Sequence, residues 1–279
     1  QRPALYALPS SQRQLMTLIL RKLLASSSFA IASTLNNLVI KLGLVIDETK
    51  KKLETIPPEF DTTDLAQNFE GFEEMSEEWI DDEEGDDDED TTKKSKVYTK
   101  DDIPLMEQEK KDLEKFRDLA KAIFTNSKGD ALLVALKKGF EMTKDLGAKQ
   151  KAIIFTESTI TQKYLSETLL PENGYAGKIV LFNGSNNDPK SKEIYASWLE
   201  KNKDTDKITG SKTADIRAAL IEYFYDEAEI MIATEAAAEG VNLQFCSLVI
   251  NYDLPWNPQR IEQRIGRCHR YGQKHDVVV

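Results

Sequence analysis

Three side chains near the end of the sequence have the types and the spacing to bind a polyphosphate. Gln263, Arg267 and Arg270 follow one another at intervals of four and three residues, and side chains so spaced share one side of a helix. Guanidinium groups carry forked donors that can pair with two phosphate oxygens at once. Two arginines three residues apart are also common as solvated charges, so the spacing alone leaves both interpretations open.

Residues 258–271 are predicted to form the helix that presents these side chains. Asn257 is a favourable N-cap, Pro258 fits the first helical position, and Gly272 is a stop signal after Tyr271. The apolar side of this helix is predicted to consist of Ile261, Ile265 and Cys268. That side would pack on the fold while the glutamine and the two arginines face outward.

The run from Gln263 to Gln273 resembles motif VI of the superfamily 2 helicases. It is most similar to the Snf2 branch, whose motif VI ends in Arg-x-Gly-Gln, and especially to the RapA-type bacterial enzymes. In these families the arginines that match Arg267 and Arg270 reach ATP bound on a partner lobe. The resemblance therefore implies that both arginines are catalytic and that, with Gln263, they bind ATP.

Four apolar runs precede this segment, and helical patterns separate most of them. Such continuous apolar strands are typical of a parallel sheet covered on both faces, which predicts an α/β fold. The runs are 151–156, 178–183, 229–234 and 248–253. The helicase resemblance implies more specifically a RecA-like three-layer domain, preceded by a helical region.

Polar residues stand at the ends of all four strands, with Asp253 at the fourth, where parallel sheets collect their ligands. Hydroxyl, amide and exposed backbone N–H groups suit phosphate contacts that fix a nucleic-acid strand without reading its bases. The predicted DNA contacts are Thr156, Ser158, Asn183, Gly184, Ser185, Thr234 and Glu235. Taken singly, each of these residues could equally be a loop cap.

The same loops resemble further helicase motifs in the correct order. Residues 151–158 look like motif IV, 182–185 like motif IVa, and 233–244 like motif V, with Gly240 and Asn242 matching its Gly-x-Asn core. The resemblance covers roughly 125–279. It implies that motifs IV, IVa and V hold phosphates of one strand, and that motif V, through Gly240 and Asn242, also reaches ATP.

Two departures from the Snf2 pattern bear on the type of enzyme. Residues 234–240 replace the Arg-Ala-Gly-Gly of eukaryotic remodelers, which favours the bacterial RapA-like side and argues against nucleosome remodelling. Tyr271 stands where an aliphatic residue is usual, a change expected to be tolerated.

The N-terminal half is predicted to contain no part of this motor lobe. Residues 1–49 read as a helical hairpin broken at Ser26-Ser27-Ser28, and 98–124 read as a helical linker. Between them, 50–97 is an acidic, proline-broken insertion that is predicted to be disordered. The lobe itself is predicted over 125–279, and Asp276–Val279 resembles the opening of another strand.

The formal net charge of −11 does not argue against nucleic-acid binding, because the excess of acidic residues is confined to one segment. Thirteen acidic residues and no basic ones lie between Glu73 and Asp90, and the remaining sequence carries 35 acidic against 37 basic residues. A basic groove elsewhere therefore stays possible.

Composition also sets expectations for location and metal binding. We expect no run as apolar as a membrane span and no signal peptide, hence a cytoplasmic protein without a membrane partner. The resemblance to RapA-type enzymes further implies a bacterial, nucleoid-associated protein. Two cysteines and two histidines, His269 and His275, lack metal-ligand spacing, so no metal site is expected in this chain.

Neither the glycine-lysine loop that cradles phosphates nor an acidic box for magnesium occurs in the sequence. The chain is therefore expected to be the second lobe of an ATP-dependent helicase or double-stranded DNA translocase. The lobe alone is expected to be inactive, with ATP and Mg²⁺ held mainly by a first RecA-like lobe.

Two alternatives from other classes stay open. One is a non-catalytic RecA-like binding module whose acidic segment recruits a basic partner. The other is a small-molecule enzyme on a doubly wound sheet, because fold does not fix function.

Overall fold

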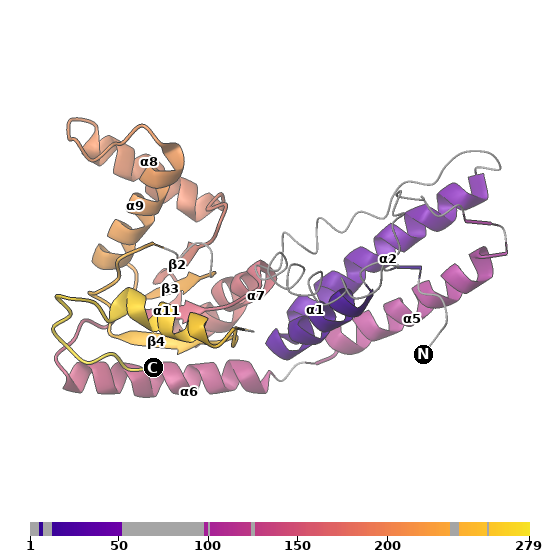
Figure 1. Ribbon diagram of the computed structural model, residues 1–279, viewed down its shortest axis with the longest axis horizontal. Coiled ribbons are helices and arrows are strands. Elements are labelled where there is room, and N and C mark those ends of the chain that lie inside the picture. The colour runs from indigo at the N-terminus through magenta and orange to yellow at the C-terminus, as the bar shows by residue number, and fades with distance from the viewer. Residues whose placement is uncertain are drawn as a thin grey trace, which may run out of the picture. The chain divides into compact units, whose positions relative to one another are not determined.

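The computed structural model describes residues 6–7, 13–51, 98–99, 101–123, 126–234, 240–255 and 257–279. The predicted acidic insertion, apart from Lys50 and Lys51, lies outside these ranges. The chain divides into two compact units, Gln1–Asn126 and Ser127–Val279, which are drawn together in Figure 1.

The described residues of the first unit include the helices α1 (Arg13–Ser26), α2 (Ser28–Lys51) and α5 (Ile103–Lys121). The predicted break at the serines is confirmed, because Ser27 Oγ accepts a hydrogen bond from Ala30 N at 3.0 Å and so caps the start of α2. Helices α2 and α5 pack lengthwise around buried Leu42 and Met106. Glu109, also buried, accepts from the backbone N–H groups of Tyr6 and Ala7.

Helix α2 corrects one expectation from the sequence. It is 24 residues long, and its most apolar window has a mean hydropathy of 1.7, so it passes the length and composition test for a membrane span. The sequence did not predict such a segment, because the apolar run is interrupted by Asn36, Asn37 and Lys41. Because 61% of that window is buried, the helix also has the character of a core helix.

The second unit is a four-stranded parallel sheet in the order β2-β3-β1-β4, as the sequence predicted for its class. The strands are β1 (Ala152–Phe155), β2 (Ile179–Phe182), β3 (Ile230–Ala233) and β4 (Leu248–Asn251). Val278 forms a parallel bridge to Leu248, so the last residues of the chain pair with β4.

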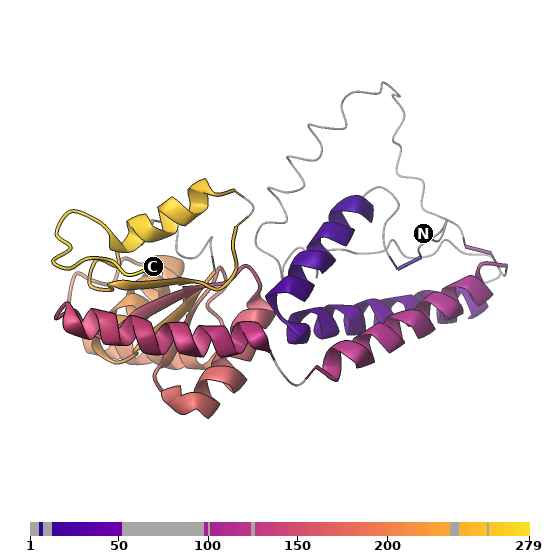
Figure 2. The same cartoon turned by 90° about the horizontal axis from the view of Figure 1, so that it is seen from below.

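Helices cover both faces of this sheet and complete three layers (Figures 1 and 2). One face packs on α8 (Pro189–Asn202), α9 (Lys212–Asp226) and α11 (Gln259–Cys268). The other packs on α6 (Ser127–Asp145) and on α7 (Thr159–Tyr164), which continues through the helical turns η2 (Leu165–Leu169) and η3 (Pro171–Tyr175). Continuous apolar strands are therefore buried on both sides, as a parallel sheet requires.

Helix α6 lies unusually close to β4. A Cβ atom added at Gly139 would come within 2.6 Å of the buried Leu248 side chain. Glycine at this position therefore allows the helix to approach the strand directly, despite its cost to helix stability.

Helices α8 and α9 are joined by a polar cluster around Glu222. Its carboxylate accepts from Lys201 Nζ at 2.7 Å, Lys207 Nζ at 3.1 Å and Trp198 Nε1 at 3.1 Å. These bonds, led by the one from Lys201, lower the pKa of Glu222 to about 2.

Both cysteines lie in the core on the α11 face of the sheet. Cys246 and Cys268 are fully buried free thiols. A hydrogen bond with the Cys246 thiol, together with burial, raises the pKa of Cys268 far above its ordinary value. The Cys268 thiol is therefore not prepared to react as a thiolate.

Replacing Glu222 should weaken the second unit in a pH-dependent way. Because its pKa is lower in the folded state, its stabilisation is present above about pH 4.5 and is lost as the pH falls toward 2. We expect Glu222→Gln to lower the unfolding free energy by ~1–2 kcal/mol at pH 7, allowing for solvent screening. Urea unfolding at pH 7 and pH 3 measures this. Glu193→Gln, in an exposed pair with Lys190, is the control; equal losses at both pH values would contradict the assignment.

The two thiols should be inert toward Ellman's reagent while the protein is folded. Burial excludes the reagent, and the raised pKa of Cys268 keeps that group protonated at pH 8. Absorbance should show almost no release of the coloured product from native protein and two equivalents after unfolding in guanidinium chloride. Rapid release of one equivalent from the native protein would show that one thiol is accessible.

Candidate nucleotide and nucleic-acid site

The candidate site lies along the carboxyl ends of the four parallel strands. Three loops leave the sheet there: 156–158 after β1, 183–186 after β2, and the segment that begins at Thr234 after β3. Helix α11 follows β4 at the same edge. Segments far apart in the sequence thus meet at one edge, as expected for a parallel sheet.

Helix α11 is shorter than predicted. It ends at Cys268, because His269 leaves the helical region with φ −86° and ψ 81°. The carbonyls of its last turn bond to tertiary partners: Arg267 O accepts from Leu243 N at 3.0 Å, and Cys268 O accepts from Gln273 Nε2 at 3.2 Å. Arg270 therefore lies just past the helix, and the prediction of one helix over 258–271 is wrong at its end.

The start of α11 agrees with the prediction to within one residue. The helix begins at Gln259, and Asn257 Oδ1 accepts from Gln259 N at 2.9 Å. The N-cap is Pro258, so the predictions of Asn257 as N-cap and Pro258 as first helical residue are each wrong by one position, although Asn257 still bonds the first turn.

The buried side of α11 is centred on a residue that the sequence analysis overlooked. Arg264 is 1% exposed, whereas Ile261 and Ile265, predicted to form the apolar side, are only half-buried. Cys268 is buried as predicted. The signal was present in the sequence, because Arg264 falls three residues after Ile261 and four before Cys268, within the predicted apolar side.

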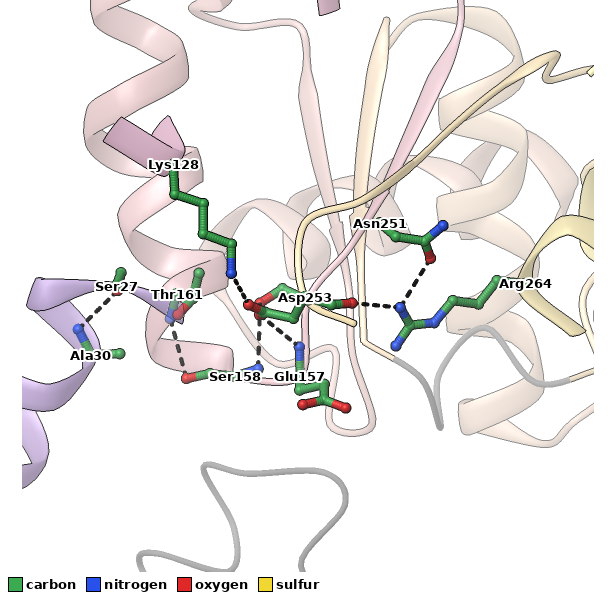
Figure 3. A network of polar contacts seen from close by, with 10 residues as sticks. Ser27, Ala30, Lys128, Glu157, Ser158, Thr161, Asn251, Asp253 and Arg264 are labelled. Atoms are coloured by element: carbon green, nitrogen blue, oxygen red, sulfur yellow. Dashed lines mark hydrogen bonds and ion pairs between the residues drawn. The ribbon is translucent and has the colours of Figure 1, made fainter. Parts of the chain in front are cut away.

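Arg264 anchors α11 to the ends of two strands. Its Nη1 atom donates to Asn251 Oδ1 at 3.0 Å and to the carbonyl of Asp253 at 2.8 Å (Figure 3). Its guanidinium lies over the Phe155 ring, 5.1 Å from the centroid. A buried guanidinium must be bonded in this way, because its desolvation is otherwise costly.

The three predicted nucleotide-binding side chains gather on or just after α11. Gln263 and Arg270 are exposed and Arg267 is half-buried. Among the residues that the structure describes, the side chains of Gln263 and Arg267 form no hydrogen bond or ion pair, whereas Arg270 Nε donates to Gly266 O at 3.2 Å. The guanidinium of Arg270 is thus bonded to a backbone carbonyl of α11, the helix that precedes it.

The motif V loop lies beside the end of α11. Besides the bond from Leu243 to Arg267, Gln273 Nε2 donates to Cys246 O at 3.3 Å. Gly240 has a φ of +75°, which favours glycine, and Asn242 Oδ1 accepts from Gln244 N. Both predicted nucleotide-binding residues of this loop, Gly240 and Asn242, are exposed.

The loops predicted to contact DNA differ in how far their polar groups are exposed. Thr156, Ser158 and Thr234 are buried. Thr156 Oγ1 donates to Asp253 Oδ2 at 2.6 Å, and Ser158 Oγ accepts from Thr161 N at 3.3 Å as the cap of α7. The hydroxyls of Thr156 and Ser158 therefore bond internally, and their DNA contacts remain predictions. Glu235 lies outside the described residues.

The loop after β2 offers more accessible groups. Gly184 and Ser185 are exposed and Asn183 is half-buried. Asn183 Oδ1 accepts from the backbone N–H groups of Ser185 and Asn186, and Asn186 Oδ1 accepts from Asn183 N. These reciprocal bonds fix the loop, although Asn186 adopts a φ of +44°.

Gln162, also missed in the sequence analysis, connects this loop to the sheet. It is buried on α7, and its Nε2 atom donates to Ile232 O at 2.7 Å. Its Oε1 atom accepts from Asn183 Nδ2 at 2.9 Å. One buried amide therefore joins the ends of β2 and β3, where two of the predicted DNA loops begin.

Comparisons with known proteins support the resemblance. Residues 160–272 match the family described as the helicase conserved C-terminal domain. An uncharacterized ATP-dependent helicase, YqhH of Bacillus subtilis (strain 168), is 41% identical over 129 residues, which are 46% of this chain and 18% of the relative. The RNA polymerase-associated protein RapA of Erwinia tasmaniensis is 46% identical over 65 residues, which are 23% of this chain and 7% of that protein.

A solved structure, the C-terminal part of the Fun30 ATPase domain, aligns over 90% of this chain and 80% of its own, with 19% identity and a TM-score of 0.38. The chain matches less than a fifth of the length of either curated relative. The family match includes strands β2, β3 and β4 and the motifs IVa, V and most of VI, whereas β1 and motif IV precede it. Residues 160–272 thus match the helicase conserved C-terminal domain, and the chain is similar to superfamily 2 enzymes of the Snf2 and RapA type.

Proposed function

We propose that this chain is the second motor lobe of an Snf2/RapA-like ATP-dependent helicase or double-stranded DNA translocase. The observation that carries the proposal is the arrangement around α11. Arg264 fixes the helix from beneath, and Gln263, Arg267 and Arg270 are left on its accessible side. A lobe built in this way can present two guanidiniums to phosphates bound elsewhere in the same protein.

Arg267 and Arg270 are proposed to stabilise the charge that develops on the transferred phosphoryl group. An arginine in this role can contribute ~10³–10⁵ in rate. Arg270 would exchange its bond to Gly266 O for a phosphate oxygen, which is a small cost for an exposed side chain. Gln263, Gly240 and Asn242 are proposed to complete the contacts to ATP.

Gly266 is consistent with close approach of a ligand or lobe to α11. Glycine inside a helix costs ~1 kcal/mol relative to alanine. None of the described residues would lie within 4 Å of a Cβ atom at this position. Packing within the described part of the chain therefore does not require glycine here, whereas an approaching phosphate or partner lobe would.

ATP and Mg²⁺ are proposed to be held mainly by the other RecA-like lobe. In the part of the chain that the structure describes, no group of three or more His, Cys, Asp and Glu side chains could hold a metal ion. We accordingly propose that this chain alone does not hydrolyse ATP and that closure of the two lobes assembles the site.

Duplex DNA is the proposed track, held by phosphate contacts. Asn183, Gly184 and Ser185 are the most accessible of the predicted contacts, on a loop fixed by its own hydrogen bonds. Binding of this type is not sequence-selective and weakens steeply with salt. The RapA relatives are named for association with RNA polymerase, so polymerase-bound DNA is a second substrate to test. A cytoplasmic, nucleoid-associated location follows from this role and is part of the proposal.

Arg270→Ala in the whole protein should abolish DNA-stimulated ATP hydrolysis. We expect a loss of at least ~10³-fold in kcat, because the substitution removes charge stabilisation in the transition state. Affinities for duplex DNA and for a non-hydrolysable ATP analogue should change by less than about threefold. Coupled-enzyme assays and fluorescence anisotropy measure these quantities. Retained turnover would overturn the role of Arg270, and absence of hydrolysis in the wild type would favour the binding-module alternative.

Arg264→Met should instead act on stability. It leaves Asn251 Oδ1 and the carbonyl of Asp253 without their buried donor, and we expect a loss of ~2–4 kcal/mol in the unfolding free energy. Urea unfolding followed by circular dichroism measures the loss. Arg270→Met is the matched control on the same segment and should change stability by less than ~0.5 kcal/mol. Equal losses in the two variants would contradict the anchoring role of Arg264.

A further inference from the structure

Asp253 occupies a position that the proposed reaction does not use. It follows β4, is 6% exposed, and lies between the loop after β1 and helix α11 (Figure 3). It is neither near the accessible side of α11 nor among the exposed loop residues. Its hydrogen bonds nevertheless connect the loop after β1 with helix α11.

The two carboxylate oxygens of Asp253 bond to different segments. Oδ2 accepts from Thr156 Oγ1 at 2.6 Å and from Glu157 N at 3.2 Å, both in the predicted motif IV loop. Oδ1 accepts from Lys128 Nζ at 2.6 Å, from the first turn of α6. The carboxylate therefore holds the motif IV loop on one side and the start of α6 on the other.

The backbone of Asp253 makes the third connection. Its carbonyl accepts from Arg264 Nη1 at 2.8 Å, and its N–H donates to Phe155 O at 3.2 Å. Arg264 in turn holds α11, which carries Gln263 and Arg267. Asp253 therefore links the motif IV loop to α11. If the motif IV loop moves and pulls on the carboxylate of Asp253, the bond from its carbonyl to Arg264 transmits the displacement to α11.

We propose that Asp253 is a positioning residue that couples nucleic-acid contact at the motif IV loop to the placement of Arg267 and Arg270. This inference rests on the proposed function and adds a route between its two sites. The carboxylate bonds to Thr156 Oγ1 and Lys128 Nζ are both 2.6 Å long and charge-assisted, and Asp253 itself is buried, so these bonds resist small displacements more strongly than surface contacts do.

Lys128 provides a fixed support for the carboxylate of Asp253. Its ammonium lies 4.4 Å from the centroid of the Tyr252 ring as well as on the carboxylate. Close packing of α6 on β4 at Gly139 keeps the helix that carries Lys128 in register with the strand that carries Asp253. The carboxylate is therefore held against a fixed support when the motif IV loop moves.

The test is Asp253→Asn in the whole protein. The substitution keeps the size of the side chain and the backbone carbonyl that holds Arg264, but it removes the charge shared by Lys128 and Thr156. We expect DNA-stimulated ATP hydrolysis to fall about tenfold, within the range typical for coupling between two sites. The rate without DNA should fall less than twofold, and the KM for ATP should stay within twofold.

Two further variants separate coupling from general damage. Lys128→Met, at a side chain that is 34% exposed, should fold and reduce the stimulation in the same direction by a smaller factor. Glu229→Gln is the matched control, because Glu229 forms a 2.8 Å ion pair with Lys178 at the opposite ends of the strands. It should leave the ratio of stimulated to unstimulated rates unchanged.

The outcomes distinguish this inference from the function on which it rests. A wild-type protein without DNA-stimulated hydrolysis would overturn the proposed function and this inference with it. Stimulation in the wild type that persists unchanged in Asp253→Asn would overturn only the coupling role. Equal falls in the stimulated and unstimulated rates would likewise overturn it, because a merely structural residue lowers both.

Discussion

The buried guanidinium of Arg264 is the interaction on which the arrangement of the site depends. A cation that is 1% exposed has few places where its donors can be bonded, and here the acceptors are Asn251 Oδ1 and the carbonyl of Asp253. Both acceptors lie at the end of β4. This requirement fixes the rotation of α11 about its axis, and that rotation decides which side chains of the helix face outward.

Once α11 is placed, its end is determined by neighbouring segments. Cys268 enters the core, and the last-turn carbonyls meet Leu243 N and the Gln273 amide. The motif V loop and the end of α11 thus share hydrogen bonds. Motif V and motif VI, which are separate in the sequence, are therefore joined by hydrogen bonds beside the arginines.

The loops at the sheet edge follow a similar principle. Gln162 and Asn183 use their amides to bond backbone groups at the ends of strands and within the loop after β2. Bonds of this kind set the loop conformation before any ligand is present, which lowers the ordering cost of binding. The polar residues of the edge therefore divide into buried members that build the loops and exposed members that can contact a ligand.

The parallel sheet could be predicted from the sequence because its strands are continuous apolar runs. Such runs are typical of strands that are covered on both faces of a sheet, whatever the order of the strands. It did not predict the order β2-β3-β1-β4, which depends on how helices cross between strands. It placed the end of α11 too late, because Tyr271 has ordinary helical character and only tertiary bonds to Arg267 O and Cys268 O stop the helix. Arg264 and Gln162 were missed because their residue types usually mark a surface, whereas the structure shows both buried and bonded. For Arg264, its position within the apolar side of the helix was the signal that could have indicated burial.

The burial of both cysteines has a practical consequence for studying motion in this protein. Cys246 and Cys268 are the two cysteines of the chain, and both are fully buried. A cysteine introduced at an exposed position such as Ser185 would therefore be the accessible thiol of this chain for maleimide dyes. Fluorescent or spin labels could then report distances to the first lobe that we propose, while the native thiols remain in place.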